Sequence, residues 1–258
     1  INVTPTSTNL SGGEYIYYAV AKDTNETSLI PDTDLELHLD ADSFPEKGEA
    51  GYSNTPTTWT ALTGSNGTIS GATFDSELGN YLDFDGSNDY VSFGDLSGFG
   101  NELSVEIWIN PDSTQSNAYA TVFDFEHSND EGWVLYQDNT TTNDYKIALK
   151  DGSSWDTTAS TSLTADTWHH IVFTVDSGNN FKLYVNNTNT QSLSGWGGLG
   201  TVAKRLNLGC WGGIDGLTRL RFWNGQIGQF RIYKTALSLA QVRQNYNFTK
   251  PSYPNGFD

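Results

Sequence analysis

Apolar and polar residues alternate along most of the chain from residue 35 onward. In each run every second residue faces the same way and is mostly apolar; the clearest runs are Leu35–Leu39, Leu103–Ile109, His169–Val175, Phe181–Val185 and Phe230–Tyr233. Successive side chains of a β-strand point to opposite faces of the sheet, so this period of two predicts strands with one buried face. Such strands are typical of an antiparallel sandwich rather than of a parallel sheet between helices.

Clusters of Asn, Asp, Ser and Gly separate these runs. They stand at Asp85–Asn88, Asp176–Asn180 and Asn186–Asn187. Asn, Asp and Gly accept the positive φ angles of tight turns, and the Asn and Asp side chains bond to the nearby backbone. We therefore expect a β-hairpin at each of the three positions.

A single helical pattern lies near the end of the chain. Ser238 and Gln241 stand three residues apart and form the sequence signature of a capping box. Leu239, Val242 and Tyr246 follow at the spacing of one helix face. Together with the strands, this pattern predicts an all-β fold with one short helix close to the C-terminus.

The two ends of the chain differ in pattern from its middle. Residues 1–30 combine a polar lead with one apolar burst, Tyr15–Ala21, and are predicted to be a strand and linker that attach to a preceding domain or a neighbour. Residues 31–250 are predicted to form one large β-sandwich, a size that 258 residues allow. Residues 251–258 begin with a proline and are predicted to be a tail or the start of a further module.

Several segments between about residues 33 and 248 match a known family in order and spacing. They resemble the laminin G-like family of the concanavalin A-like lectin/glucanase superfamily at Leu35–Ala41, Thr58–Gly64, Tyr81–Val91, Leu103–Ile109, Thr167–Val172, Phe181–Asn186, Gly225–Tyr233 and Ala236–Ser238. The resemblance implies an antiparallel two-sheet jelly-roll β-sandwich. It does not fix a function, because this fold carries lectins, adhesins, glycanases and spacers.

A second resemblance concerns the context of the domain. Ser11–Ala21 is similar to a segment of bacteriophage tail and fibre proteins, whose laminin G-like domains often end in a stretch like Asn245–Asn247. This resemblance implies a bacteriophage virion surface or another extracellular location. It also implies neighbouring virion subunits as partners and a multicopy assembly.

Charge and composition exclude several classes of partner. Against 31 acidic residues stand 13 basic ones, a net charge of −18, whereas nucleic-acid binding needs clustered Lys and Arg. No apolar run approaches the roughly 20 residues that span a membrane. Cys210 is the one cysteine, so no intrachain disulfide is possible. A single cysteine fits assembly in a reducing compartment, and the chain opens without the pattern of a signal peptide.

The laminin G resemblance implies a calcium site at the rim of the sandwich. It assigns Asn129 and Asp130, in the loop after residues 121–125, and Asp215, the first carboxylate in the opposing loop. Calcium needs six to eight oxygens, and a set with so few carboxylates favours one ion rather than two. A second option lies at Asp40 or Asp42 beside the closing strand, where Gln229 stands in place of the Asp of many relatives.

Tryptophans among glycines indicate a carbohydrate-binding surface. The stretch from residue 194 to residue 223 contains Trp196, Trp211 and Trp223, and glycines leave an indole face open to stack on a sugar ring. Because the chain has 8 tryptophans, most of them are expected in the core. Trp196 and Trp211 are the candidates for exposed stacking.

Candidate catalytic groups are few. Asp124 and Glu126 share a strand face, but they lack the third acid and the surroundings of the family's glycanases. His169 and His170 point to opposite faces of a strand, so they cannot chelate one ion together, and we predict a structural role for both. The sequence therefore predicts a protein that is not an enzyme.

The expected function is adhesion without catalysis. A tail-fibre or capsid decoration module would contact host-surface glycans through weak interactions, which many copies make effective. Three alternatives remain open at this point: a secreted bacterial carbohydrate-binding or adhesin domain, a purely structural virion module, and a glycan-cleaving enzyme.

Overall fold

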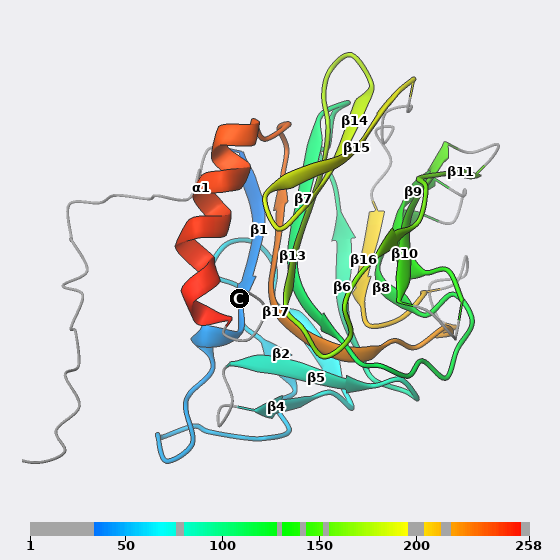
Figure 1. The fold of residues 1–258 in the computed structure, drawn as a ribbon. Helices are drawn as coiled ribbons and strands as arrows, with labels where there is room; N and C mark the ends of the chain where they lie inside the picture. Colours follow the sequence, from blue (N-terminus) through cyan, green and yellow to red (C-terminus); the bar gives the residue numbers. More distant parts are fainter. Residues whose placement is uncertain are drawn as a thin grey trace, which may run out of the picture.

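The chain folds into two antiparallel β-sheets that pack face to face, with one short helix on the outer side of the first sheet (Figure 1). The computed structural model describes residues 34–75, 80–127, 131–139, 143–151, 155–195, 204–212 and 218–253. The predicted all-β jelly-roll sandwich with one helix near the C-terminus is confirmed. The predicted N-terminal segment, residues 1–30, lies outside the described residues.

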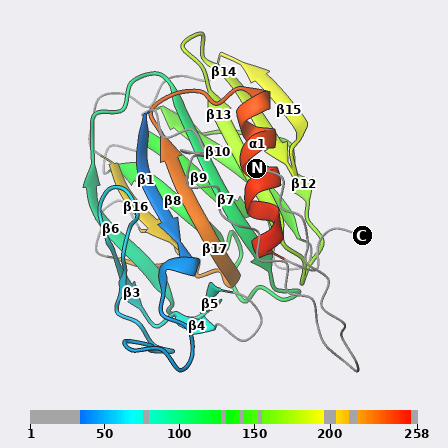
Figure 2. The same ribbon diagram turned by 90° about the vertical axis from the view of Figure 1, so that its left-hand side faces the viewer.

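The first sheet has eight strands among the described residues, in the order β15-β14-β13-β7-β17-β5-β4, with β1 paired to β17 (Figure 2). Their bounds are β1 (Leu35–Asp40), β4 (Thr73–Asp75), β5 (Tyr81–Asp85), β7 (Leu103–Pro111), β13 (His169–Val175), β14 (Asn180–Val185), β15 (Thr188–Ser194) and β17 (Asn224–Tyr233). The long strand β17 therefore holds β5 at one end and β1 at the other.

The second sheet has nine strands in the described part of the chain, in the order β11-β10-β9-β8-β16-β6-β3-β2, with β12 paired to β10. Their bounds are β2 (Thr58–Trp59), β3 (Gly67–Ser70), β6 (Tyr90–Leu96), β8 (Thr121–His127), β9 (Glu131–Gln137), β10 (Asp144–Asp151), β11 (Trp155–Thr157), β12 (Thr161–Ser162) and β16 (Lys204–Leu208). Two single turns of 3-10 helix, η1 (Ala41–Ser43) and η2 (Lys250–Ser252), complete the elements together with helix α1 (Leu239–Thr249).

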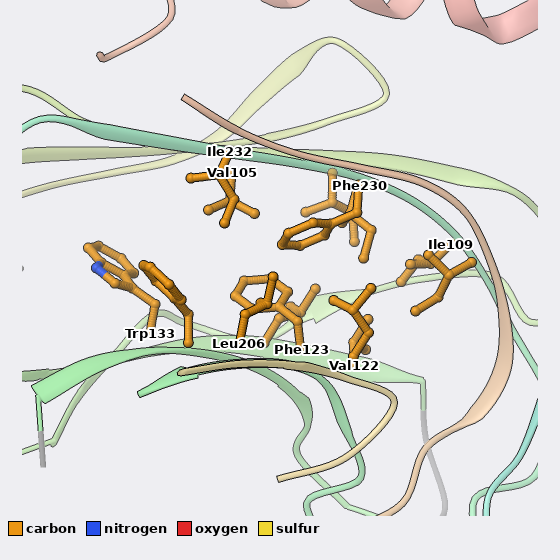
Figure 3. Close-up of a cluster of buried hydrophobic side chains, with 14 of the residues drawn as sticks. Val105, Ile109, Val122, Phe123, Trp133, Leu206, Phe230 and Ile232 are labelled. Carbon is orange, nitrogen blue, oxygen red and sulfur yellow. The ribbon is translucent and has the colours of Figure 1, made fainter. Parts of the chain in front are cut away.

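The main core lies between the two sheets and is rich in aromatic rings. Figure 3 shows side chains of the first sheet facing those of the second across this layer. Phe173 stacks on Trp133 at 4.7 Å and on Phe123 at 5.9 Å between ring centroids. Each fully buried side chain of this size contributes about 1.5–3 kcal/mol to folding, so the aromatics supply much of the stability.

A second buried layer lies on the outer side of the first sheet, under α1. Trp108 of β7 stacks on Tyr246 at 5.7 Å and on Tyr253 at 4.6 Å, and its indole N–H donates to Thr249 Oγ1 at 2.8 Å. Every residue of β13 is buried. The prediction of one buried face is therefore wrong for the central strands of this sheet, because the helix and the segment that follows it cover the second face.

A buried charged group joins this helix to the sheet. Glu106 of β7 accepts hydrogen bonds from His170 at 2.8 Å, Arg231 at 3.0 Å and Asn245 of α1 at 2.7 Å. Burial alone would raise the pKa of Glu106, but the Arg231 charge and these donors bring that pKa down to about 2. Glu106 is therefore a carboxylate at neutral pH, although only 1% of its surface is exposed.

Helix α1 begins at the capping box that the sequence predicts. The Ser238 side chain accepts the Gln241 backbone N–H, and the Gln241 side chain accepts the Ser238 backbone N–H. The buried face consists of Val242, Asn245, Tyr246 and Thr249, whereas Leu239 is exposed. The predicted stripe is therefore wrong at Leu239, and the buried face also includes a polar residue, Asn245, which donates to Glu106 at 2.7 Å.

Two of the three predicted hairpins are present. Asn186 and Asn187 join β14 to β15 with φ angles of 48° and 62°, as a two-residue type I′ turn requires. Asp176–Asn180 joins β13 to β14. The prediction was wrong at Asp85–Asn88, which leads from β5 in the first sheet to β6 in the second. Its side chains still bond locally, since Asp85 accepts the Ser87 backbone N–H at 2.8 Å.

Packing extends past residue 250, where the sequence predicted the end of the sandwich. Tyr253 is buried against Trp108 and Trp168, with ring centroids 4.6 Å away in each case. Its ring also lies on Gly228 of β17, where an added Cβ would stand 2.2 Å from Tyr253 Cε1. Residues up to Tyr253 thus belong to the packed structure. No helix in the described part of the chain is long and apolar enough to cross a membrane.

Candidate functional site

A shallow hollow of about 190 Å³ opens on the outer face of the second sheet. Two small apolar side chains form its floor, and aromatic, hydroxyl and guanidinium groups form its walls. We call it the aromatic hollow; it is lined by Tyr119, Val134, Tyr136, Ala148, Thr157, Trp211 and Arg221. Helix α1 packs on the first sheet, so it lies on the opposite side of the molecule (Figure 1).

The floor follows from strand alternation in β9 and β10. Trp133 and Leu135 point into the core, and Val134 between them therefore points outward. Val134 pairs with Ala148 of β10, which pairs with Thr157 of β11. These three small side chains form one row across the sheet. Because they are short, the larger side chains around them enclose a depression.

Trp211 follows β16, and hydrogen bonds hold its own backbone and that of the next residue. Its backbone pairs with Leu220, each N–H donating to the other's carbonyl at 2.9 and 3.0 Å. The buried Asp124 carboxylate accepts the N–H of Gly212, the next residue, at 2.7 Å. A Cβ at Gly212 would stand 2.3 Å from Asn207 Nδ2, so only glycine fits there without rearrangement. The indole is therefore held by its backbone rather than by burial of its ring.

Tyr119 and Arg221 both have left-handed backbone conformations, with φ angles of 60° and 54°. Such angles are rare for large side chains and cluster at functional sites. Thr121, at the start of β8, holds both residues: its N–H donates to the Arg221 carbonyl at 2.8 Å, and its hydroxyl donates to the Tyr119 carbonyl at 3.0 Å. The sheet thus fixes two strained residues at the rim of the hollow.

The walls of the hollow contact one another through ring faces. The Arg221 guanidinium lies over the Trp211 ring at 4.7 Å and over the Tyr119 ring at 5.4 Å. Tyr119 also packs on Tyr136, with ring centroids 5.9 Å apart. Burial raises the pKa of the Tyr136 hydroxyl, which therefore stays neutral at physiological pH and can donate a hydrogen bond. The hollow thus combines aromatic faces with hydroxyl and guanidinium donors.

The tryptophans divide clearly between core and surface. Of the six whose side chains the structure describes, all but Trp211 are buried, namely Trp59, Trp108, Trp133, Trp168 and Trp223. Trp211 is half-buried in the wall of the aromatic hollow. Trp196, the other predicted stacking residue, lies outside the described residues. Sugar stacking by either residue stays a prediction.

The predicted calcium ligands Asn129, Asp130 and Asp215 also lie outside the described residues. Among the described residues, no group of three or more His, Cys, Asp and Glu is placed to hold a metal ion. At the second predicted position, Asp40 Oδ2 accepts the Gln229 side-chain amide at 2.6 Å. That carboxylate therefore faces an amide donor instead of a second carboxylate.

The candidate catalytic acid Asp124 has a structural task in this fold. Only 2% of its surface is exposed, and its carboxylate holds the Gly212 backbone beside Trp211. The side chain of Glu126 lies outside the described residues. His169 and His170 are both buried, and they bond to the Thr164 carbonyl and to Glu106. Their contacts are those of the predicted structural role.

Sequence reasoning missed three residues of the aromatic hollow, Tyr119, Tyr136 and Arg221. A signal for Tyr136 was present, since β9 carries apolar residues on both of its faces. Arg219 and Arg221, close to Trp211 in a chain with 13 basic residues, were a signal for local positive charge. For Tyr119 the sequence contains no such signal, because its position depends on a backbone angle that its residue type does not favour.

Comparison with known proteins supports the same fold. A family model described as "Concanavalin A-like lectin/glucanases superfamily" matches residues 85–243. No curated protein matches the chain.

Solved structures of similar fold include receptor-binding domains of botulinum neurotoxins. The domain of the C/D mosaic serotype has a TM-score of 0.64 at 16% identity and covers 87% of this chain and 55% of its own. The binding domain of botulinum neurotoxin DC in complex with SialylT has a TM-score of 0.60 at 14% identity, covering 83% and 51%. This chain spans about half the length of these structures, and at such identities the likeness concerns the fold alone.

Proposed function

Since the chain belongs to the concanavalin A-like lectin/glucanases superfamily, we propose that it is a non-catalytic carbohydrate-binding module. The aromatic hollow is its ligand site. One observation carries the proposal: Trp211, unlike the other tryptophans with described side chains, is not buried, and Tyr119 and Tyr136 stand around the same hollow.

The chemistry of the hollow suits a sugar ring. The C–H face of a pyranose is apolar and packs on an indole or phenol ring, whereas its hydroxyls need donors and acceptors around the edge. Trp211, Tyr119 and Tyr136 supply aromatic surface, although Arg221 covers one face of the Trp211 and Tyr119 rings. The Tyr136 and Thr157 hydroxyls and the Arg221 guanidinium supply polar groups. Pockets of this kind, mostly apolar with a few convergent polar groups, are the usual form of small-molecule sites.

Cell-surface glycans are the ligand class that this proposal favours. Similar folds occur in receptor-binding domains of botulinum neurotoxins, one of them solved in complex with SialylT. A hollow of about 190 Å³ contacts only a small part of a glycan, so each copy binds weakly. Many copies on one particle would raise the overall avidity by orders of magnitude without new contacts.

The proposed context is the surface of a bacteriophage virion. The similarity of Ser11–Ala21 to tail and fibre proteins supports a tail-fibre or capsid decoration module that adheres to the host. In that setting the neighbouring subunits are partners, and residues 1–30 would attach the domain to them by strand addition. A secreted bacterial adhesin would use the same hollow without those partners.

The test is glycan binding by the full chain and by Trp211→Ala. The chain is clustered on a multivalent carrier and applied to an array of host-type glycans, so that weak binding is measurable. Removing the indole is expected to lower the signal at least about tenfold, as truncation of a central aromatic contact does. Phe248→Ala is the control, because Phe248 is an exposed ring (46%) that lies on α1, on the opposite side of the molecule from the hollow.

Unchanged binding by Trp211→Ala would move the ligand site away from the aromatic hollow. No binding by the wild-type chain to any glycan would favour the purely structural virion module. Product release from a glycan, lost in Glu126→Gln, would instead identify an enzyme. Thermal unfolding of each variant shows whether the fold is intact, since the Trp211 side chain is half-buried.

A further inference from the structure

Building on the proposed function, we propose that the aromatic hollow selects an acidic sugar and that the carboxylate of this sugar pairs with Arg221. The inference concerns the class of ligand: a terminal sugar unit that carries a carboxylate, such as a sialic acid or a hexuronic acid. It rests on how Arg221 is held and on what the neighbouring cations contact.

Arg221 is positioned by ring faces. Its guanidinium lies over Trp211 and Tyr119, at 4.7 and 5.4 Å from the ring centroids. Stacking on a ring face uses the flat side of the guanidinium, and its N–H donors lie in the plane of the group. Two of these donors in parallel match the two oxygens of a carboxylate. The rings thus fix the cation without consuming its hydrogen bonds.

The neighbouring cations differ from Arg221 in this respect. Arg219 donates to the Gly212 carbonyl at 3.3 Å and stabilises the loop that carries Trp211. Lys146, beside Tyr136 in the sheet, is paired with Asp138 at 2.9 Å. Within the described residues, no acidic side chain and no carbonyl group accepts a hydrogen bond from the Arg221 side chain. Among the described side chains around the hollow, Arg221 is therefore the cation best placed to bind an added anion.

The backbone of Arg221 is also restricted in conformation. Its φ of 54° is a left-handed backbone angle that large residues rarely adopt, and the Thr121 N–H holds its carbonyl in place. A flexible surface arginine would lose side-chain freedom on binding an anion, whereas this one is already restricted by two rings and a strained backbone. Such preorganisation lowers the cost of binding.

The net negative charge of the chain disfavours the approach of anions. Its net charge is −18, but at physiological salt exposed charges act over only about 8 Å. A carboxylate in the hollow therefore responds mainly to Arg221. The volume of about 190 Å³ is below the roughly 300–1,000 Å³ of pockets for larger ligands. It fits one sugar unit at the end of a glycan better than a segment within it.

The experiment compares acidic and neutral sugars of matched structure. The full chain is titrated with 3′-sialyllactose and its methyl ester, and with trigalacturonate and its methyl ester. The acidic probe of one pair is expected to bind at least about tenfold more tightly than its neutral counterpart, the usual effect of a charge-assisted hydrogen bond. The pair that shows this preference identifies the source of the carboxylate.

Arg221→Gln is the decisive variant, because glutamine has a similar stem and no charge. It is expected to abolish the preference for the acidic probe, while Arg221→Lys retains only part of it, since lysine lacks the planar pair of donors. Arg243→Gln, an exposed arginine of α1, is the control and is expected to change nothing. Wild-type melting behaviour of Arg221→Gln would show that the fold is retained.

The outcomes separate this inference from the proposed function. Equal binding of acidic and neutral probes, lost in Trp211→Ala, overturns the role of the carboxylate and leaves the carbohydrate site in place. A preference for the acidic probe that persists in Arg221→Gln also overturns it. Failure of all four probes and of a broad glycan array to bind overturns both proposals.

Discussion

The Glu106 carboxylate lies at the centre of a network of buried polar side chains. It accepts hydrogen bonds from β13, β17 and α1 through His170, Arg231 and Asn245, and the Tyr233 hydroxyl donates to it at 3.3 Å. Arg231 is as deeply buried as Glu106. Each charge is therefore tolerable only because the other is present.

Replacing Glu106 by Gln leaves the Arg231 charge buried without its partner. We expect a loss of about 3–5 kcal/mol in the free energy of unfolding, the usual cost of breaking a buried ion pair. Urea titration at pH 7 measures it. Glu36→Gln is the control: Glu36 pairs with Lys234 at 2.6 Å, but both side chains are about one-third exposed, and the expected loss is below about 1 kcal/mol. Equal losses in the two variants would contradict this account.

Residue type predicted some individual roles and not others. The opposite orientation of His169 and His170 follows from strand geometry alone, and the abundance of tryptophan correctly indicated that most of these residues lie in the core. Tyr119 and Arg221 could not be predicted, because Thr121 hydrogen-bonds to both backbones and is far from Arg221 in the sequence. Tertiary contacts, which no local pattern records, decide such angles.

At the scale of elements, β17 shows how a single missing side chain shapes packing. The pairing of β17 with β7 shifts register between Ile227 and Gln229, around Gly228. The ring of Tyr253 occupies the space that a side chain at Gly228 would take. The segment after α1 can therefore dock on the first sheet and complete its second buried layer.

Gly228→Ala tests this docking. The added methyl group would stand 2.2 Å from Tyr253 Cε1, so the ring must move out of a closely packed layer. We expect a loss of about 1–3 kcal/mol, as for other overpacked core sites. Gly94→Ala in β6, where nothing lies within 4 Å, is expected to change stability by less than about 0.5 kcal/mol. Chemical denaturation of both variants gives the comparison; similar values would mean that Tyr253 adapts without cost.

Local patterns predicted the elements well and their partners less well. Alternation located the strands, and the capping box located the start of α1. The turn at Asp85–Asn88 has hairpin chemistry but crosses between the sheets, because residue type fixes the bend and not the sheet that the next strand joins. The double burial of β13 depends on α1, which follows it by more than 60 residues.

At the scale of the whole molecule, the ordered set of family segments predicted the sandwich, but the aromatic hollow escaped prediction. Each strand can be recognised within its own segment, from the alternation of apolar and polar residues. The hollow combines Tyr119, Tyr136, Trp211 and Arg221, which come from three separate parts of the chain. Only the strand order β10-β9-β8-β16 brings those parts together.

The predicted rim calcium ion would stabilise the whole fold. A ligand at about 100 times its dissociation constant adds about 2.7 kcal/mol to the folded state, which raises the melting temperature by about 5 °C or more. We expect this shift when calcium replaces chelator, and its loss in Asp130→Ala. Asp156→Ala, an exposed acid on β11, is the control. Identical melting with calcium and with chelator would remove the site.

The single thiol of the chain, Cys210, allows the local opening of the segment next to Trp211 to be measured. Cys210 is buried, and burial raises its pKa to about 12, so a thiol reagent can react only after the segment next to Trp211 opens. When the segment recloses faster than the reagent reacts, the rate of modification is proportional to the population of the open segment in an otherwise intact protein. Without any engineered label, the modification rate thus measures whether an added glycan stabilises the closed segment next to Trp211.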